Sequence, residues 1–474
     1  MRGVSRFFSG ALRCMRKKER KVRRMKKSVS KMSFVVLAVL LLVASVIPIA
    51  LASPANPFRR MANTESGHAT WDSDIINIEA VNETGDEIYV AVLDTGLAPN
   101  WRDYFPKDRI LTRLGKGFIQ PLSFEWVEDV LYARTGAPVH ESTFIGSIST
   151  THGTHVVSTI IGYYYDTFYD SVAGYPLPPI IVRGIAPNAN IIPIKVLADY
   201  TIPPNPEYDF PEQVANFGTS AMVAAGINYA IDLAIDGYNP MIITMSLGGP
   251  DLDVIEQTAI DRAIANDVIV VAAAGNEGEE GMSYPGAYTP VISVGACGWT
   301  DEWLHPGDGP YFRLWWLQSD YYPYADISEP PPPDEVYIPD WSSRQLAGQE
   351  LDVLAPGSWV RGPYPGFPGY AHMPWWSQGI GHIVGNNPGT FYYVGGTSMA
   401  TPHVAGVAAL MLEKNSTLNQ GQIETILRDT ALSIPGGSAN VYDVFEGAFV
   451  PISWGDNATG AGLIQANEAI VAVT

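Results

Sequence analysis

The 474-residue chain carries 49 acidic and 29 basic residues, a net charge of −20, and 46% of its residues are hydrophobic. This acidic excess argues against nucleic acids and anionic membranes as partners, because both would repel a strongly negative protein. The chain is long enough to bury a large hydrophobic core, so its fold does not have to depend on disulfides.

Residues 1–52 are predicted to be a basic leader and signal peptide. They hold 13 of the basic residues and one acid, the stretch 34–52 is almost wholly apolar, and small residues precede a cleavage point at Ser53. We therefore expect a secreted, extracellular protein, with a charge of about −32 after cleavage. Nineteen apolar residues could also just span a bilayer, so a membrane-anchored protein at the cell surface is the alternative.

Only two cysteines occur, and Cys14 lies in the leader. The other, Cys297, has no partner for an internal disulfide and ends the apolar run Val-Ile-Ser-Val-Gly-Ala-Cys. We interpret Cys297 as a buried, small apolar side chain.

After an N-terminal arm at 53–87, near-continuous apolar runs alternate with helical patterns in residues 88–474. Strands are expected at 88–93, 191–197, 241–246, 268–273 and 291–295, and helices near 152–161, 219–236, 253–266 and 398–413. Apolar strands separated by helices are typical of a parallel sheet covered on both faces. The predicted fold class is therefore α/β, with a mostly parallel sheet and helices on both sides.

Polar residues follow two of these predicted strands. Asp94 closes the first strand, where open α/β sheets place their catalytic groups, and His152 begins a helix expected to pack against that strand. Asn276 follows the strand at 268–273, beside two glycines, and its amide could donate to an oxyanion.

Ser398 lies in Gly-Gly-Thr-Ser-Met-Ala-Thr-Pro, at the start of an Ala- and Val-rich helix. A helix N-terminus favours developing negative charge, but a serine hydroxyl also needs a base, and that base needs an orienting acid. His152 and Asp94 can supply these two roles. A lone serine in this context is more often a helix cap, and only the coincidence of all four residues favours a nucleophile.

Two other site types share parts of these motifs. Asp-Thr-Gly at Asp94 is also typical of pepsin-like aspartic peptidases, but the chain contains no second such triplet to share a proton. His152 and His155 share a helical face and could hold a metal, but no His-Glu-x-x-His pattern or third ligand is apparent. We interpret His155 as a packed, hydrogen-bonded core residue.

Together the four segments resemble the subtilisin-like (subtilase) serine peptidases, from about Tyr89 to about Glu468 and in the family's order Asp, His, Ser. The resemblance implies a catalytic set of Asp94, His152, Ser398 and Asn276. It also implies that the backbone of Ser246, Leu247 and Gly248 pairs with an extended substrate. Ala274 and Gly275 would form the opposite wall of the primary specificity pocket, and such small walls predict a roomy apolar pocket.

The chain departs from compact relatives by insertions near 97–150, 299–341 and 358–393, which are rich in aromatic residues or proline. Long loops in a compact domain are often functional, although a stabilising surface wrap explains them equally well. Relatives that are secreted commonly carry a folding-assisting propeptide, yet only 41 residues separate the expected cleavage point from Asp94.

The chemistry itself requires no cofactor, but the resemblance implies structural calcium. Asp103 falls where the family often has a calcium ligand, and Asp166 and Asp170 lie in a loop after the predicted His152 helix. These residues do not supply the six or more oxygens that calcium needs.

These observations predict a secreted, monomeric serine endopeptidase that cleaves protein or peptide substrates through an acyl-enzyme intermediate. Its activity should fall as the pH drops below the histidine range, because the base must be neutral. One rival is a binding protein that kept the scaffold and lost activity, but every catalytic position holds a working residue type. Another is a sedolisin-like carboxyl peptidase, which the histidine in its full motif disfavours.

Overall fold

The computed structural model describes residues 64–127, 130–147, 151–165, 180–208, 211–304, 315–319, 322–323, 326–365 and 391–474. The leader at 1–52, Asp166 and Asp170 therefore lie outside the described residues, as do 53–63 of the arm and 366–390 of the third insertion.

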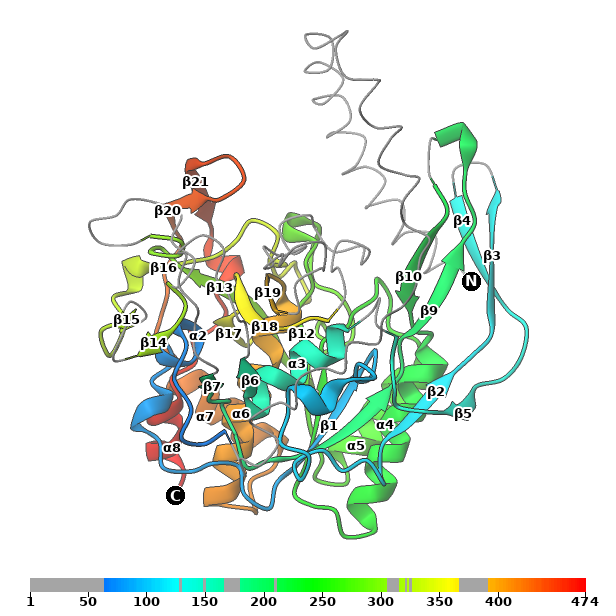
Figure 1. Cartoon of the computed structure of the whole chain (residues 1–474), viewed down its shortest axis with the longest axis horizontal. Coiled ribbons are helices and arrows are strands. Elements are labelled where there is room, and N and C mark those ends of the chain that lie inside the picture. The colour runs from blue at the N-terminus through cyan, green and yellow to red at the C-terminus, as the bar shows by residue number, and fades with distance from the viewer. Residues whose placement is uncertain are drawn as a thin grey trace, which may run out of the picture.

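A nine-stranded sheet forms the centre of the molecule (Figure 1), in the order β16-β13-β12-β11-β1-β8-β2-β5 with β17 also paired to β13. All of its pairings are parallel except those of the end strands β5 and β16. The strands are β1 (Tyr89–Asp94), β2 (Lys116–Ile119), β5 (His140–Ser142), β8 (Asn190–Lys195), β11 (Met241–Met245), β12 (Ile269–Ala273), β13 (Ile292–Trp299), β16 (Val336–Tyr337) and β17 (Val353–Pro356). The five predicted strands are all present, within a few residues of their expected bounds.

Helices cover both faces of this sheet, as predicted. The helices are α2 (Trp71–Asp74), α3 (His152–Ile161), α4 (Ser220–Ile235), α5 (Val254–Ile264), α6 (Thr397–Lys414), α7 (Gln420–Asp429) and α8 (Ala466–Ala472). Alternate strand residues explain the two faces: Val90 and Val92 join the core beneath α3 and α6, whereas Ala91 and Leu93 join the core beneath α4 and α5. Two buried layers thus fix the sheet between two groups of helices.

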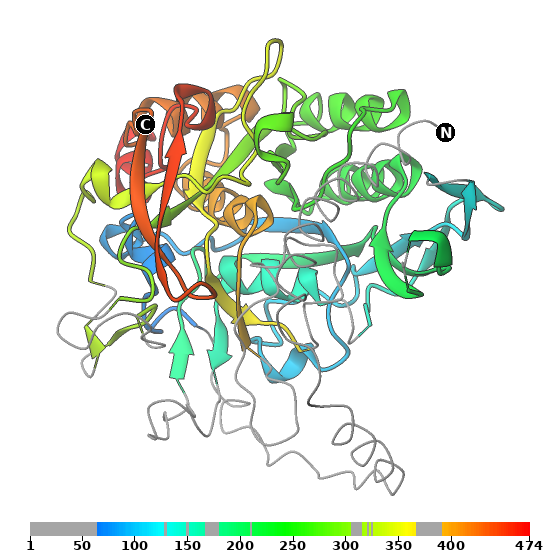
Figure 2. The same ribbon diagram turned by 90° about the horizontal axis from the view of Figure 1, so that it is seen from above.

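Six two-stranded sheets among the described residues lie outside the main sheet. They pair β3 (Leu122–Val127) with β4 (Val130–Thr135), β6 (Tyr163–Tyr165) with β7 (Ile180–Val182), β9 (Ala198–Ile202) with β10 (Gln213–Phe217), β14 (Gln318–Ser319) with β15 (Tyr322–Pro323), β18 (Val360–Pro363) with β19 (Phe391–Val394), and β20 (Gly437–Asp443) with β21 (Ala448–Trp454). Hairpins β3-β4 and β9-β10 lie side by side and share a small core of their own. Seen from above (Figure 2), β20-β21 lies on the opposite side of the molecule from them.

The N-terminal arm and the second insertion are built into the main core. Four tryptophans of these two segments are fully buried, each 0% exposed: Trp71, Trp303, Trp315 and Trp316. The Trp71 ring lies 5.7 Å from that of Trp315, and its backbone N–H donates to Trp316 O. The described part of this insertion is therefore held by a buried aromatic cluster, which favours the stabilising interpretation of its tryptophans.

Two further expectations concern Cys297 and a membrane-spanning helix. Cys297 is fully buried with a free thiol, as predicted, and burial raises its pKa. None of the helices in the described ranges has both the length and the apolarity needed to cross a membrane.

Candidate active site

The side chains of Asp94 and His152 meet at the end of β1. Asp94 is 1% exposed, and His152 Nδ1 lies 2.9 Å from both of its carboxylate oxygens. Asp94 Oδ1 also accepts the backbone N–H of Thr95 at 2.6 Å. A buried carboxylate on Nδ1 fixes the imidazole ring and leaves Nε2 as the nitrogen that can exchange a proton.

Residues beside each of these two side chains allow α3 to approach β1 closely. A Cβ at Gly153 would lie 2.6 Å from Gly96 O and 3.1 Å from Asp94 Cβ, so a larger residue would push the helix away. The Gly153 N–H donates to Thr95 Oγ1 at 2.9 Å, and Thr154 Oγ1 accepts from Ala98 N at 2.8 Å. The His-Gly-Thr motif is thus explained by the distance between helix and strand.

Ser398 lies in the first turn of α6, which packs directly against α3. Its hydroxyl donates to Ser246 O at 3.1 Å, and Ser246 Oγ donates back to Ser398 O at 2.7 Å. The carbonyl of Ser398 is free for this bond because Pro402, four residues on, has no N–H. Ser398 thus lies at the start of α6, the helix beside the one that carries His152. The described residues show no hydrogen bond from its hydroxyl to His152.

Asn276 joins the same site through Thr397, the residue before Ser398. Its Oδ1 accepts the Thr397 N–H at 2.8 Å and the Thr397 hydroxyl at 3.1 Å. Because the oxygen end of the amide is used in this way, the NH2 end is the one left to donate. Thr397, whose hydroxyl also accepts from Gly275 N, was not identified from the sequence, although it lies in the Gly-Thr-Ser motif.

The expected substrate-binding residues lie on the two strand ends that flank Ser398. Ser246, Leu247 and Gly248 directly follow β11, and Ala274 and Gly275 directly follow β12. A further segment, at Ser283 and Tyr284, is bonded to both walls. Its Ser283 N–H donates to Ala274 O, and its Tyr284 exchanges two backbone bonds with Gly249.

His155 lies one turn along α3 from His152, and it is a core residue. It is 0% exposed, and its Nε2 lies 3.1 Å from Val360 O. Burial, followed by the neighbouring His152, lowers the pKa of His155 to about 3. A neutral, buried imidazole bound to a carbonyl agrees with the prediction of a packed, hydrogen-bonded histidine.

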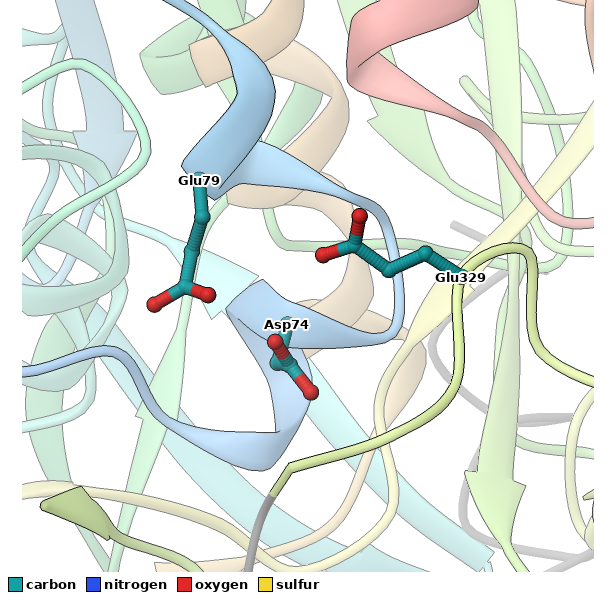
Figure 3. Close-up of side chains that lie close together, drawn as sticks. All are labelled: Asp74, Glu79 and Glu329. Carbon is teal, nitrogen blue, oxygen red and sulfur yellow. The ribbon is translucent and has the colours of Figure 1, made fainter. Parts of the chain in front are cut away.

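A separate group of three carboxylates lies between the arm and the second insertion (Figure 3). Asp74, Glu79 and Glu329 each place an oxygen within 4.8 Å of the others, and the side chains turn toward one another. Asp74 is 1% exposed, and burial with nearby negative charge raises its pKa to about 7, against a lowering contribution from the Ile327 N–H. Carboxylate oxygens are the ligands that calcium prefers, so this group fits a hard cation. Asp103, the residue expected from the resemblance, lies elsewhere, in the turn Trp101–Asp103.

The chain is similar to known proteins over most of its length. The model of the Subtilase family matches residues 85–449. Subtilisin DY from Bacillus licheniformis is 30% identical over 287 residues, which are 60% of this chain and 71% of that protein. Subtilisin E from Bacillus subtilis is 28% identical over 352 residues, 73% of this chain and 61% of the relative. Among solved structures, the S41 psychrophilic protease matches with a TM-score of 0.50 at 20% identity, over 85% of this chain and 99% of that one, which shows the fold alone.

The chain therefore belongs to the Subtilase family and has the α/β subtilisin-like fold. It is a serine-type endopeptidase, acting on protein or peptide substrates.

Proposed function

We propose that the protein is a secreted serine endopeptidase in which Asp94, His152 and Ser398 form the catalytic triad. As the Ser398 hydroxyl attacks the scissile carbonyl, His152 Nε2 takes its proton and later gives that proton to the leaving amine. The resulting acyl-enzyme is hydrolysed by water, which His152 deprotonates in the same way. Asp94 holds the imidazole and stabilises its cation throughout.

The observation that supports this proposal best is the contact between His152 Nδ1 and both oxygens of the buried Asp94, at 2.9 Å. A structural helix cap needs no orienting acid of this kind. A metal-bound histidine often has a carboxylate on its other nitrogen, but among the described residues His152 belongs to no group of three possible metal ligands. In the resting structure the Ser398 hydroxyl donates to Ser246 O, so the attack requires it to turn to His152. Catalytic hydrogen bonds are often long or misaligned before substrate binds.

Asn276 and the backbone N–H of Ser398 are proposed to stabilise the oxyanion. The anchoring of Asn276 Oδ1 by Thr397 supports this role, because it holds the amide at the start of the Ser398 helix. The backbone of Ser246, Leu247 and Gly248 is proposed to pair with an extended substrate, with Ala274 and Gly275 across the specificity pocket.

Replacing Ser398 by Ala tests the proposal. The variant should lose hydrolysis of casein and labelling by a fluorophosphonate, while its circular dichroism stays that of the wild type. Casein clearing by the unaltered protein separates an active peptidase from a binding protein built on the same scaffold. Labelling that persists in the Ser398 variant would refute the assignment of the nucleophile.

The remaining parts of the proposal concern the state of the protein. We infer a monomer, exported by a leader at 1–52, with membrane anchoring as the alternative if that leader is not cleaved. We also infer structural calcium at Asp74, Glu79 and Glu329, where the cation would neutralise three crowded carboxylates without entering the chemistry.

A further inference from the structure

The hairpin β18-β19 connects the two helices of the candidate site. Strand β18 packs on α3 (Figure 1), where Val360 O lies 3.1 Å from His155 Nε2 and a Cβ at Gly362 would lie 2.9 Å from the same nitrogen. Strand β19 leads into α6 after only two glycines. The position of this hairpin on α3 therefore governs where Ser398 lies relative to His152.

Arg361, inside β18, is a buried cation. The residue is 8% exposed. The ion pairs among the described residues do not include it, and its Nε has no hydrogen-bond partner among them. Removing a charge from water is costly unless other groups compensate for the loss, so the surroundings of Arg361 must do so.

Three aromatic rings lie against the guanidinium group. Its Cζ lies 4.2 Å from the ring centroid of Tyr393, 5.5 Å from that of Tyr165 and 5.6 Å from that of Trp316. The faces of such rings attract a cation within about 6 Å, and more strongly where water is excluded. Nη2 also donates to Tyr165 OH at 3.1 Å. We call Arg361 and these three rings the arginine cage.

The arginine cage joins the segment that follows α3 to the segment that precedes α6. Tyr163 and Tyr165 belong to β6, which follows α3 after one glycine. Tyr163 OH donates to Arg361 O at 2.8 Å, so both the backbone and the side chain of Arg361 are bound to β6. On the other side, Tyr393 is the register partner of Arg361 in β19, five residues before Ser398.

We propose that Arg361 is a positioning residue of the peptidase. It holds β19, and with it the turn that carries Ser398, at the distance from α3 at which the serine hydroxyl can reach His152. In the resting structure this hydroxyl donates to Ser246 O, so a small displacement of the turn decides whether it can turn to the imidazole. The inference rests on the proposed function and goes beyond it, because Arg361 acts on the triad through the hairpin and not by contact.

Arg361→Met tests the proposal, because it removes the charge but keeps a flexible stem in the arginine cage. An apolar side chain replaces a buried charge, so the thermal midpoint in the Ser398→Ala background should stay the same or rise. The kcat for a peptide substrate should nevertheless fall by roughly tenfold or more with KM unchanged, since a misplacement of about 1 Å can cost about 10²-fold. Arg361→Lys keeps a charge but loses the planar guanidinium, so its kcat should lie between the two.

Labelling by a fluorophosphonate separates positioning from folding. The amplitude counts the folded molecules, whereas the rate constant reports how readily His152 activates Ser398. In Arg361→Met the rate constant should fall by the same factor as kcat, with the amplitude of the wild type. A wild-type rate constant would overturn the proposal, and a reduced amplitude beside it would assign Arg361 to folding alone. If Arg361→Met does not fold, Tyr165→Phe decides: it removes only the oxygen that Nη2 reaches and should lower the rate constant by a smaller factor, and no change would overturn the proposal.

Arg428→Met is the matched control. Arg428 Nη1 donates to Glu350 Oε1 at 2.5 Å and to Asp352 Oδ1 at 2.6 Å, at the amino end of β17. Loss of these bonds should lower the thermal midpoint but leave the labelling rate constant unchanged. An equal fall of the rate constant in this control would assign the effect to reduced stability and overturn the proposal. If the wild type neither cleaves any peptide nor reacts with a fluorophosphonate, the proposed function itself fails, which distinguishes that outcome from a wrong role for Arg361.

Discussion

At Asn276 the two ends of one amide have different tasks. The oxygen is fixed by the backbone and hydroxyl of Thr397, which leaves the nitrogen to donate, as the proposed oxyanion role requires. A preorganised donor of this kind costs no reorganisation during the reaction. The same logic applies to His152, whose Nδ1 is occupied by Asp94 so that Nε2 is the nitrogen left for the proposed proton transfer.

Asn276→Ala should therefore lower kcat with little change in KM, because the donor acts on the transition state. A loss of about 10²–10³ is expected, a figure that comes from a subtilisin and not from this geometry. Steady-state kinetics on a peptide substrate measure it. Asn276→Asp is the companion variant, since it keeps an oxygen for Thr397 but cannot donate; wild-type kcat in that variant would mean that Asn276 only anchors the nucleophile turn.

The residues of the candidate site could be predicted from the sequence where several neighbouring residues are each required by the packing. Gly153 and Thr154 follow His152 because of the short helix-to-strand distance, and this leaves a readable pattern. The anchoring of Asn276 by Thr397 leaves no such pattern, since a threonine before a serine has many uses. This contact joins two segments that are distant in the chain, and only the folded structure brings them together.

At the scale of elements, the arm and the second insertion meet at a crowded acidic contact. Asp74 ends α2, and its Oδ2 accepts the N–H of Ile327 at 2.6 Å. The carboxylates of Glu79 and Glu329 lie beside it, and both of these residues are solvent-exposed. This contact therefore holds two segments together while it concentrates negative charge between them.

The free energy of unfolding should consequently fall as the pH rises from about 4 to about 7. The pKa of Asp74 is raised from 3.8 to about 7, so in this window the folded protein binds a proton that the unfolded chain has lost. Each pKa unit corresponds to about 1.4 kcal/mol, so Asp74 alone should lower the free energy of unfolding by up to about 4 kcal/mol. Urea unfolding of the Ser398→Ala background in EDTA at pH 4 to 8 avoids autolysis and measures the slope. Asp74→Asn should make the slope shallower without removing it, because burial also raises the pKa of Glu256 to about 7 and that of Glu302 to about 8. An equal slope in that variant would contradict the assignment.

Calcium should reverse this loss of stability at pH 8. A cation that binds only the folded protein stabilises it by about 2.7 kcal/mol when its concentration is 100 times Kd. The thermal midpoint of the Ser398→Ala protein should therefore rise on adding calcium, and Asp74→Asn should abolish the rise. Asp334→Asn, an exposed acid outside the group, is the control. An equal rise in Asp74→Asn would place the calcium elsewhere.

Elements with strong hydrophobic periodicity were predictable. The helix expected at 219–236 is present as α4, Ser220–Ile235. Its apolar residues recur at helical spacing because one face of the helix packs on the sheet. The hairpins β3-β4 and β9-β10 were not predicted. Their residues are half-buried against each other, and a pattern that depends on a partner hairpin cannot be read from one segment.

At the scale of the whole molecule, the N-terminal arm belongs to the same core as α6, the helix that carries Ser398. Asp72 in α2 lies 3.1 Å from His403 Nε2 in α6, and Asn77 Nδ2 donates to Gln465 Oε1 beside α8. The Ala466 N–H also donates to Ile76 O. The arm thus connects the start of the described chain to its last helices.

Removing this arm should unfold the protein, whereas removing the leader should not. Trp71, Ile75, Ile76 and Ile78 are each 0% exposed. Their burial contributes about 1.5–3 kcal/mol apiece, which together approaches the total stability of an ordinary domain, about 5–15 kcal/mol. In the Ser398→Ala background, a chain that begins at residue 61 should show a cooperative thermal transition, and one that begins at residue 82 should show none. Sequencing the N-terminus of the exported protein should accordingly find it upstream of Thr64. A cooperative transition in the shorter chain would mean that the arm only covers a core that is stable without it.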